Sequence, residues 1–209
     1  MTLTPGGLEV VAHTTVVLAR HGLAERGTAG TDGGDPGLAA HGVAQAKALA
    51  VELAGEPFEA VYCSPQRRAL ETAAPLCAEL GLEPQVRDGL AEFDLRFGAY
   101  VLLAEMKAAG DPRYDACMAG DLTAWGTDLA TFRADAVAVL REIVERHAGG
   151  RAFVVTHGGV LNVLLGAVLG LDRMWFFHPD NCGISRVAVD TGGRMRLAAL
   201  NEARHLPTS

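Results

Sequence analysis

The sequence lacks an excess of basic residues. Its 209 positions hold 18 Lys and Arg against 25 Asp and Glu, for a formal net charge of −7. No overall positive field is therefore available to attract nucleic acid or an anionic membrane. We predict neither as a partner. An anionic small substrate is compatible with this charge, but a local cluster of arginines and histidines would have to hold it.

Cysteines are also few, and they are scattered without a CxxC pair or metal-ligand spacing. The four are Cys63, Cys77, Cys117 and Cys182. This pattern is typical of buried, reduced thiols in a cytosolic protein. Four histidines likewise show no paired ligand spacing: His41, His147, His178 and His205. We predict that the protein binds no metal and no cofactor.

Long hydrophobic runs are absent as well. The longest apolar stretch, Val160 to Leu171, contains Asn162 and is shorter than the roughly 18 residues of a membrane span. The first twelve residues contain no Lys or Arg and no long apolar core, so we expect no secretory signal. We predict a cytoplasmic protein with one domain over residues 1–209, in which 1–12 form a loose tail and Leu8–Val11 add an edge strand.

Apolar runs predict strands that alternate with helices. The predicted strands are residues 14–20, Ala60–Cys63, Gln85–Arg87, Ala152–Thr156 and a hairpin of Ile184–Asp190 with Arg194–Leu200. The predicted helices are Leu38–Leu53, a segment from an N-cap at Ser64 to about Leu80 that Pro75 kinks or interrupts, Leu129–His147, and one from 158 to about Leu169. This order indicates an α/β fold with a mainly parallel sheet and helices on both faces.

Two less regular segments separate these elements. Residues Ala24–Pro36 are rich in Gly, Thr and Asp and read as a loop that forms a wall or lid. Residues 101–127 are broken by glycines and a proline into short helices and loops. We predict that this helical insertion covers the ends of the sheet.

Two predicted strands end in the same dipeptide, His21-Gly22 and His157-Gly158. A histidine at one strand end is more often an ordinary hydrogen-bonded surface residue. In a parallel sheet, however, both strand ends lie at the same edge, where open α/β sheets bind ligands. The two imidazoles are therefore expected to share one pocket, with Arg20 as a fixed cation beside the nucleophile His21.

These motifs resemble the histidine phosphatase superfamily, whose best-known branch is the phosphoglycerate mutases. The matching segments, in the family's order, are Arg20-His21-Gly22, Leu38-Ala39-Ala40-His41-Gly42, Ser64-Pro65-Gln66-Arg67-Arg68-Ala69, Thr156-His157-Gly158-Gly159 and Asn201-Glu202-Ala203-Arg204. They are spread over nearly the whole chain. The resemblance implies a phosphoglycerate-mutase-like fold, and a homodimer as the assembly.

The resemblance also implies roles for individual residues. His21 would attack phosphorus and carry a phosphohistidine, and His157 would donate to the phosphoryl group. Arg20 and Arg68 would hold the phosphoryl oxygens, because a planar guanidinium fork matches a tetrahedral anion. Spacing alone would make Arg68 a solvated helix charge. Its neighbour Arg67 is interpreted as facing solvent.

The acid–base residue is Glu92 in this interpretation. The family places a carboxylate in a segment that resembles Leu90-Ala91-Glu92, where it would protonate the leaving oxygen and then activate water. The residues that follow, 93–100, depart from the family's usual glycine and aromatic-acidic-glycine run. Asp94 therefore stays a competitor, and a purely structural carboxylate is a third reading.

A second departure concerns the substrate. The run Leu23-Ala24-Glu25-Arg26-Gly27 lacks the threonine and asparagine of mutase-like members. We therefore favour a metal-independent phosphatase that hydrolyses a small phosphomonoester. The alternatives are a phosphoglycerate-mutase-type phosphotransferase, a protein-phosphohistidine phosphatase, and a phosphate-binding regulator without catalysis. A bisphosphate requirement would indicate the mutase, and absence of turnover the regulator.

Some aromatic and charged residues have two interpretations. Four aromatic side chains could line a pocket for an apolar leaving group, although core packing is the commoner role for most such residues. They are Trp125, Trp175, Phe176 and Phe177. Arg26 is more often a solvated loop charge than a group that reaches into a site.

Overall fold

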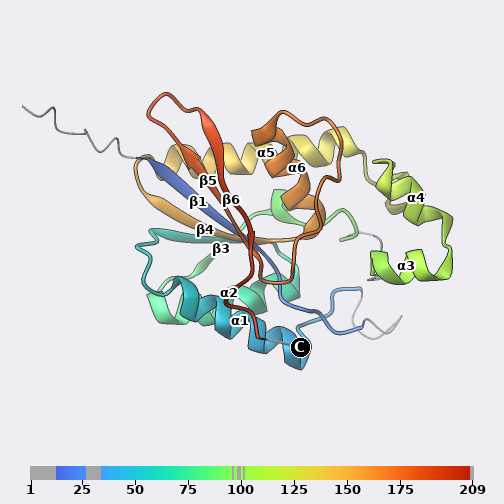
Figure 1. Cartoon of the computed structure of the whole chain (residues 1–209), viewed down its shortest axis with the longest axis horizontal. Helices are drawn as coiled ribbons and strands as arrows, with labels where there is room; N and C mark the ends of the chain where they lie inside the picture. Colours follow the sequence, from blue (N-terminus) through green and yellow to red (C-terminus); the bar gives the residue numbers. More distant parts are fainter. Residues whose placement is uncertain (1–12, 27–33, 96, 98–99, 101, 208–209) are drawn as a thin grey trace, which may run out of the picture.

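The computed structural model describes residues 13–26, 34–95, 97, 100 and 102–207. They contain a six-stranded sheet of order β3-β2-β4-β1-β5-β6, with helices packed on both of its faces (Figure 1). The first four strands in that order run parallel, and β5 runs antiparallel to its neighbours β1 and β6. The α/β architecture predicted from the sequence is confirmed. The predicted tail and edge strand lie outside the described residues.

The elements follow the predicted order closely. The strands are β1 (Thr14–Arg20), β2 (Ala60–Cys63), β3 (Pro84–Val86), β4 (Arg151–Thr156), β5 (Ile184–Val189) and β6 (Met195–Glu202). The α-helices are α1 (Ala40–Leu53), α2 (Arg67–Leu80), α3 (Leu103–Ala109), α4 (Pro112–Met118), α5 (Leu129–Arg146) and α6 (Gly158–Leu169). Two short 3₁₀ helices, η1 (Asp88–Leu90) and η2 (Thr123–Trp125), complete the order.

The sheet separates two hydrophobic cores. Side chains alternate across a strand, so Val16 and Leu18 of β1 face the core beneath α5 and α6. Val17 and Ala19 face the opposite core, beneath α1 and α2. All four are fully buried, which explains why this parallel strand reads as one continuous apolar run.

The register of the parallel strands brings the two histidines together. Arg20, the last residue of β1, pairs with Thr156, the last residue of β4. His21 and His157 are therefore the first residues beyond two neighbouring strands. The end of β2 lies beside the same edge, because Cys63 pairs with Val155.

Three local predictions need correction. Helix α1 begins at Ala40 rather than Leu38. Helix α2 has its N-cap at Gln66, not at Ser64, and it continues through Pro75 to Leu80 without interruption. A proline removes one helix hydrogen bond, and tertiary packing here outweighs that local cost.

The insertion between η1 and α5 is helical and lies at one end of the molecule (Figure 1). Its helices are short because Gly110 ends α3 and Gly126 ends η2, both in the left-handed conformation. Asp111 caps α4 by accepting a hydrogen bond from the Arg113 amide. The prediction of short helices over 101–127 is confirmed, with residue 101 outside the described part.

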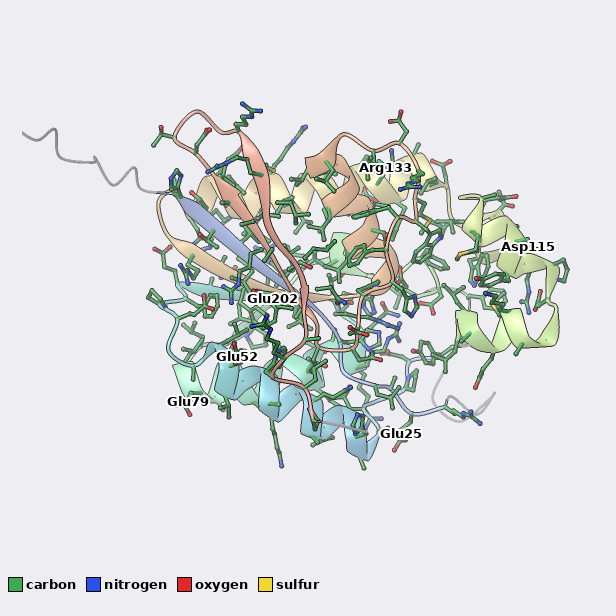
Figure 2. All side chains as sticks on the ribbon, in the orientation of Figure 1. Glu25, Glu52, Glu79, Asp115, Arg133 and Glu202 are labelled. Atoms are coloured by element: carbon green, nitrogen blue, oxygen red, sulfur yellow. The ribbon has the colours of Figure 1, made fainter. Side chains whose placement is uncertain are left out.

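Many charged side chains are exposed. Glu52 on α1, Glu79 on α2 and Asp115 on α4 are examples, labelled in Figure 2. The four cysteines are free and buried. None of the helices within the described residues is long and apolar enough to span a bilayer.

Candidate active site

His21 lies just beyond β1, and the backbone fixes its position from three directions. Its amide donates to the Thr156 carbonyl at 2.9 Å, and its carbonyl accepts from the Asn181 side chain at 2.9 Å. The next residue, Gly22, donates its amide to the Thr72 hydroxyl at 2.9 Å. The imidazole is thus held by three segments that are distant in sequence.

The His21 ring is a neutral imidazole with a defined tautomer. Its Nδ1 lies 2.7 Å from the Gly22 carbonyl oxygen. A carbonyl can only accept, so Nδ1 carries the proton and the lone pair is on Nε2. Burial, and then the charges of Arg20 and Arg68, hold the His21 pKa well below its usual value. The ring is therefore uncharged at neutral pH, with a lone pair on Nε2.

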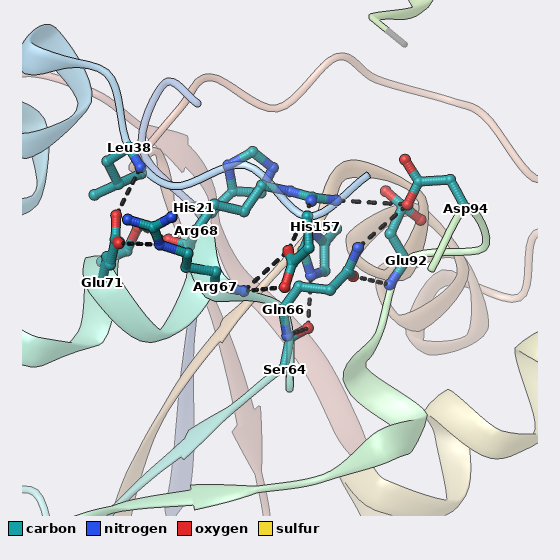
Figure 3. A network of polar contacts seen from close by, with 12 residues as sticks. His21, Leu38, Ser64, Gln66, Arg67, Arg68, Glu71, Glu92, Asp94 and His157 are labelled. Carbon is teal, nitrogen blue, oxygen red and sulfur yellow. Dashed lines mark hydrogen bonds and ion pairs between the residues drawn. The ribbon is translucent and has the colours of Figure 1, made fainter. Parts of the chain in front are cut away.

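His157 lies beside His21, with 5.0 Å between ring centroids (Figure 3). Its Nε2 is 2.7 Å from the Ser64 hydroxyl oxygen, and that oxygen accepts a hydrogen bond from the backbone amide of Gln66 at 3.2 Å. The hydroxyl keeps its own proton free to donate to Nε2, and in that arrangement the His157 proton is on Nδ1. This Nδ1 is buried and has no hydrogen-bond partner.

Two buried guanidinium groups accompany the imidazoles. Arg20 donates from Nη1 to the Pro179 carbonyl at 2.8 Å, while its Nε has no partner. Arg68 is 1% exposed, and its Nε and Nη1 make no hydrogen bond. Buried donors without acceptors are costly, at about 1–3 kcal/mol each. These nitrogens, with His157 Nδ1, form a set of donors suited to an anion with several oxygens.

Glu92 is at the opposite side of the site, against the N-terminus of α6. Its Oε2 accepts from the Gly159 amide at 2.8 Å, and its Oε1 from the Phe93 amide at 3.2 Å. A Cβ at Gly159 would lie 2.3 Å from Oε1, so only glycine permits this approach. Burial and then the charge of Asp94 raise the Glu92 pKa to about 7. This carboxyl can give or take a proton near neutrality.

Asp94 occupies a different environment, next to Arg68. Its Oδ1 is 3.5 Å from Arg68 Nη2 and accepts a hydrogen bond from the side-chain Nε2 of Gln66 at 3.3 Å (Figure 3). The Gln66 side chain also accepts from the Glu92 backbone amide at 2.7 Å. Gln66 thus ties both acidic residues to the start of α2. Asp94 contacts a guanidinium, whereas the hydrogen bonds to the Glu92 carboxyl from the described residues come from backbone amides.

A pocket of about 210 Å³ joins these groups. Its polar lining includes Arg20, His21, Arg68, Glu92 and Asp94. His178 and Asn181 add two further polar groups, and much of the remaining wall is apolar or aromatic: Phe93, Tyr100, Leu102, Leu103, Trp125 and Trp175. The described lining residues include Gly158 but not its neighbour His157. Because Leu102, Leu103 and Trp125 line this pocket, the insertion covers the sheet edge as predicted.

The remaining sequence interpretations divide clearly. Trp125 and Trp175 line the pocket, whereas Phe176 and Phe177 pack against the core. The Arg67 side chain is 59% exposed and pairs with Glu71 at 2.7 Å. Arg26 is likewise a solvated surface charge. Arg26, 86% exposed, pairs with Glu105 on α3 at 3.2 Å instead of entering the pocket.

Sequence reasoning missed the parts of Ser64, Gln66 and Asn181. Ser64 follows a parallel strand, β2, just as the two histidines follow β1 and β4, so the same strand-end argument applies to it. Asp35, from the predicted wall loop, caps α2 through the Arg67 amide and lies 3.5 Å from Arg68 Nη1. No pattern in the sequence links that loop aspartate to α2.

The described residues contain no cluster of three or more His, Cys, Asp or Glu side chains suited to a metal ion. His147, for example, lies away from the site, hydrogen-bonded to Tyr62 and Glu59. His205 contacts the Cys182 carbonyl. These histidines serve the packing of the sheet and its edge.

Known proteins share this sequence pattern and fold. A phosphoserine phosphatase of Hydrogenobacter thermophilus is 28% identical over 206 residues, covering 91% of this chain and 93% of that protein. The structure of Bacillus stearothermophilus YhfR superposes with a TM-score of 0.77 at 25% identity, over 93% of this chain and 100% of that one. An Entamoeba histolytica phosphoserine phosphatase mutant with bound phosphoserine gives 0.73 at 22% identity, over the same shares. The last likeness shows the fold alone.

The family model for the histidine phosphatase superfamily (branch 1) matches residues 16–203. The match extends from β1 through α2 and β4 to the end of β6, and so includes every side chain of the pocket described above. The chain therefore belongs to branch 1 of the histidine phosphatase superfamily.

Proposed function

We propose that this protein is a metal-independent phosphatase that hydrolyses a small phosphomonoester through a phosphohistidine on His21. Membership of the family and the phosphatase names of its relatives support a phosphoric monoester hydrolase. The observation that carries the mechanism is the set of buried donors without hydrogen-bond partners on Arg20, Arg68 and His157, beside a neutral His21 imidazole. We further propose that residues 1–209 act as a single domain.

In the first step, His21 Nε2 attacks the phosphorus atom. A bond from Nε2 to phosphorus forms while the bond from phosphorus to the ester oxygen breaks, and that oxygen takes the proton of Glu92. The Glu92 pKa of about 7 keeps a large fraction of this carboxyl protonated at neutral pH. The alcohol leaves, and the imidazole carries the phosphoryl group.

In the second step, a water molecule attacks the phosphohistidine. Glu92, now a carboxylate, takes one proton from that water while oxygen binds phosphorus and the bond to Nε2 breaks. Inorganic phosphate is released, and both residues return to their starting protonation states. One residue near pKa 7 serves as acid and then base because the two steps require opposite states in turn.

The cations bind and stabilise the phosphoryl group in both steps. Arg20 and Arg68 each supply an Nε–H without an acceptor, Arg68 adds Nη1–H, which lies 3.5 Å from Asp35, and His157 supplies Nδ1–H. Ser64 sets the His157 tautomer through its hydrogen bond to Nε2. These donors are fixed before substrate arrives, so they need little reorganisation as charge spreads over the phosphoryl oxygens. Asp94 is a positioning residue that orients Arg68.

The decisive experiment compares the wild type with His21→Ala on p-nitrophenyl phosphate in the presence of EDTA. We expect wild-type turnover that survives EDTA and a loss of at least about 10⁴-fold in the variant. Rapid acid-free quenching should trap a phosphoenzyme in the wild type alone. Circular dichroism checks that the variant is folded. Equal activity in the two proteins would refute the assignment of His21, and inhibition by EDTA would refute the metal-free mechanism.

A further inference from the structure

Beyond its two phosphoryl-binding arginines, the described lining of the pocket offers no arginine or lysine to pair with a carboxylate on the substrate. Among the described lining residues, the only arginines are Arg20 and Arg68, and both hold the phosphoryl group in the proposed mechanism. Arg26, in the neighbouring loop, is paired with Glu105 and does not line the pocket. The carboxyls of Glu92 and Asp94 do line it. A second anionic group on the substrate would find no further arginine there, and His178 is the remaining basic side chain among the described lining residues besides His21.

The same side of the pocket presents a fixed aromatic wall. Phe93 makes edge-on contacts with Trp125 and Trp175, with ring centroids 5.3 Å and 6.4 Å apart. The Trp175 indole is further held by a hydrogen bond from Nε1 to the Cys117 carbonyl at 2.9 Å. Rings held in this way bind an apolar group without first losing conformational freedom.

Helix α3 completes this wall with two leucines. Leu102 and Leu103 are half-buried and line the pocket at the start of the helix. Partly exposed leucines at a pocket mouth leave apolar surface that a ligand can cover. The volume of about 210 Å³ is below the roughly 300–1,000 Å³ of sites for drug-sized ligands, so the leaving group is small.

We propose that the preferred substrates are phosphomonoesters of small, uncharged, apolar alcohols or phenols, with a leaving group about the size of one ring. This inference rests on the proposed function, since it names the substrate class of the same site. The phosphoryl group lies between Arg20 and Arg68, and the leaving group contacts Trp175 and Leu103. Its chemistry is the two-step transfer described above, and the alcohol leaves with the proton of Glu92.

The test compares three alkyl monoesters, so that each leaving group is an alkoxide: 2-phenylethyl phosphate, O-phosphoserine and 3-phosphoglycerate. We expect kcat/KM for 2-phenylethyl phosphate to exceed the other two values by about 10–100-fold, the range that burial of one ring supports. Ethyl phosphate, which lacks the ring, should fall below 2-phenylethyl phosphate by a similar factor.

A charge substitution in the wall provides the second arm. Leu103→Lys should lower kcat/KM for 2-phenylethyl phosphate and raise it for 3-phosphoglycerate, narrowing their ratio at least tenfold. Leu169→Lys is the matched control, because Leu169 is 45% exposed at the end of α6 and does not line the pocket. It adds the same charge and should leave the ratio unchanged. The wild-type comparison decides the matter even if Leu103→Lys fails to fold.

The outcomes separate the two proposals. Wild-type preference for O-phosphoserine or 3-phosphoglycerate, with a phosphoenzyme still trapped on His21, would overturn the substrate class and leave the proposed function standing. Equal ratios in the Leu103→Lys and Leu169→Lys variants would also overturn it. Absence of turnover and of phosphoenzyme with every ester would overturn the proposed function, and this inference with it.

Discussion

At the scale of single residues, the pocket places two guanidinium groups, an imidazole and a carboxyl close together. Without a ligand, burying these groups side by side is unfavourable. Two guanidiniums flank an imidazole that burial and their charges keep neutral. Across the pocket, a carboxyl is kept partly protonated by burial and by its neighbour Asp94. Each group is thereby held in the protonation state that the first step requires.

The raised Glu92 pKa predicts a particular pH profile. With an alkyl phosphate, kcat/KM should fall as pH rises above about 7, because Glu92 loses the proton that the leaving oxygen needs. The lowered pKa of His21 places the acid limb below that residue's usual range. Glu92→Gln should lose about 10²–10⁴-fold in activity and also lose the alkaline limb. Steady-state rates from pH 4 to 9 measure both effects.

The pH dependence of the unfolding free energy should report the raised Glu92 pKa independently of turnover. The folded-state pKa of about 7 lies above the ordinary 4.5, so the folded state binds the proton more tightly. That stabilisation is present below pH 4.5 and is lost as pH rises through 7. Relative to Glu92→Gln, the wild type should lose at most about 3 kcal/mol of unfolding free energy between these limits. Parallel urea melts of the two proteins, with no divergence across this range, would contradict the assignment.

Residue roles could be predicted from the sequence only where a strand end marked them. His21 and His157 follow apolar strands, and the sheet register brings them together as expected. Arg68 required the family resemblance, because a helix arginine is an ordinary surface residue by pattern alone. The distinction between Glu92 and Asp94 depends on contacts with Gly159 and Arg68 that span long sequence separations. Local sequence carries no record of such contacts.

At the scale of elements, α1 packs so closely on the segment after β1 that a side chain is excluded. A Cβ at Gly42 would lie 2.0 Å from the Leu23 carbonyl oxygen, and one at Gly22 would lie 2.7 Å from the Gly42 carbonyl. The turn that carries His21 therefore rests directly on the helix backbone. The close approach that Gly22 and Gly42 permit thus determines where His21 lies relative to the edge of the sheet.

Gly42→Ala should therefore destabilise the fold and impair the site together. Alanine normally favours a helix over glycine, but here the overlap should cost about 1–3 kcal/mol and displace the segment that follows His21. Gly55→Ala is the control, because no atom lies within 4 Å of its added Cβ. It should change stability by less than about 0.5 kcal/mol. Thermal melts and kcat/KM of both variants check this, and equal effects would contradict the packing argument.

Element boundaries were predictable where capping chemistry is local, and less so where tertiary contacts dominate. Helix α5 begins after the N-cap Asp128 and ends at Arg146, within one residue of the prediction. Ser64 had the chemistry of an N-cap, yet its hydroxyl contacts His157. Pro75 had the chemistry of a helix breaker, yet α2 continues through it. In both cases a partner distant in sequence outweighs the local preference.

At the scale of the whole molecule, an anion should stabilise the fold by satisfying the unpartnered donors. At a phosphate concentration of 100 Kd, the expected gain is about 2.7 kcal/mol, or about 5–10 °C in Tm. Arg68→Met should lose most of this shift. Arg133→Met is the control, because Arg133 also has an unpartnered buried Nε but lies on α5, outside the pocket. A shift reduced equally in both variants would show that phosphate binds elsewhere.

The overall architecture was the most predictable level, because alternating strand and helix patterns leave few topologies. The mainly parallel sheet with helices on both faces is confirmed. Assembly and cellular location have no comparable pattern. A homodimer and a cytoplasmic location therefore stay predictions, and gel filtration with light scattering would test the first.

The position of β1 in the sheet also determines when the molecule can begin to work. Both of its sheet neighbours, β4 and β5, come from after residue 150, so β1 has neither of them for most of translation. His21 leaves the ribosome early, but His157 and Asn181 follow more than 130 residues later. A chain still being synthesised therefore contains His21, Arg20 and Arg68 but lacks His157 and the strand β4 that precedes it. The proposed site can therefore assemble only after β4 has been made and has inserted between β2 and β1, which precede it in the sequence.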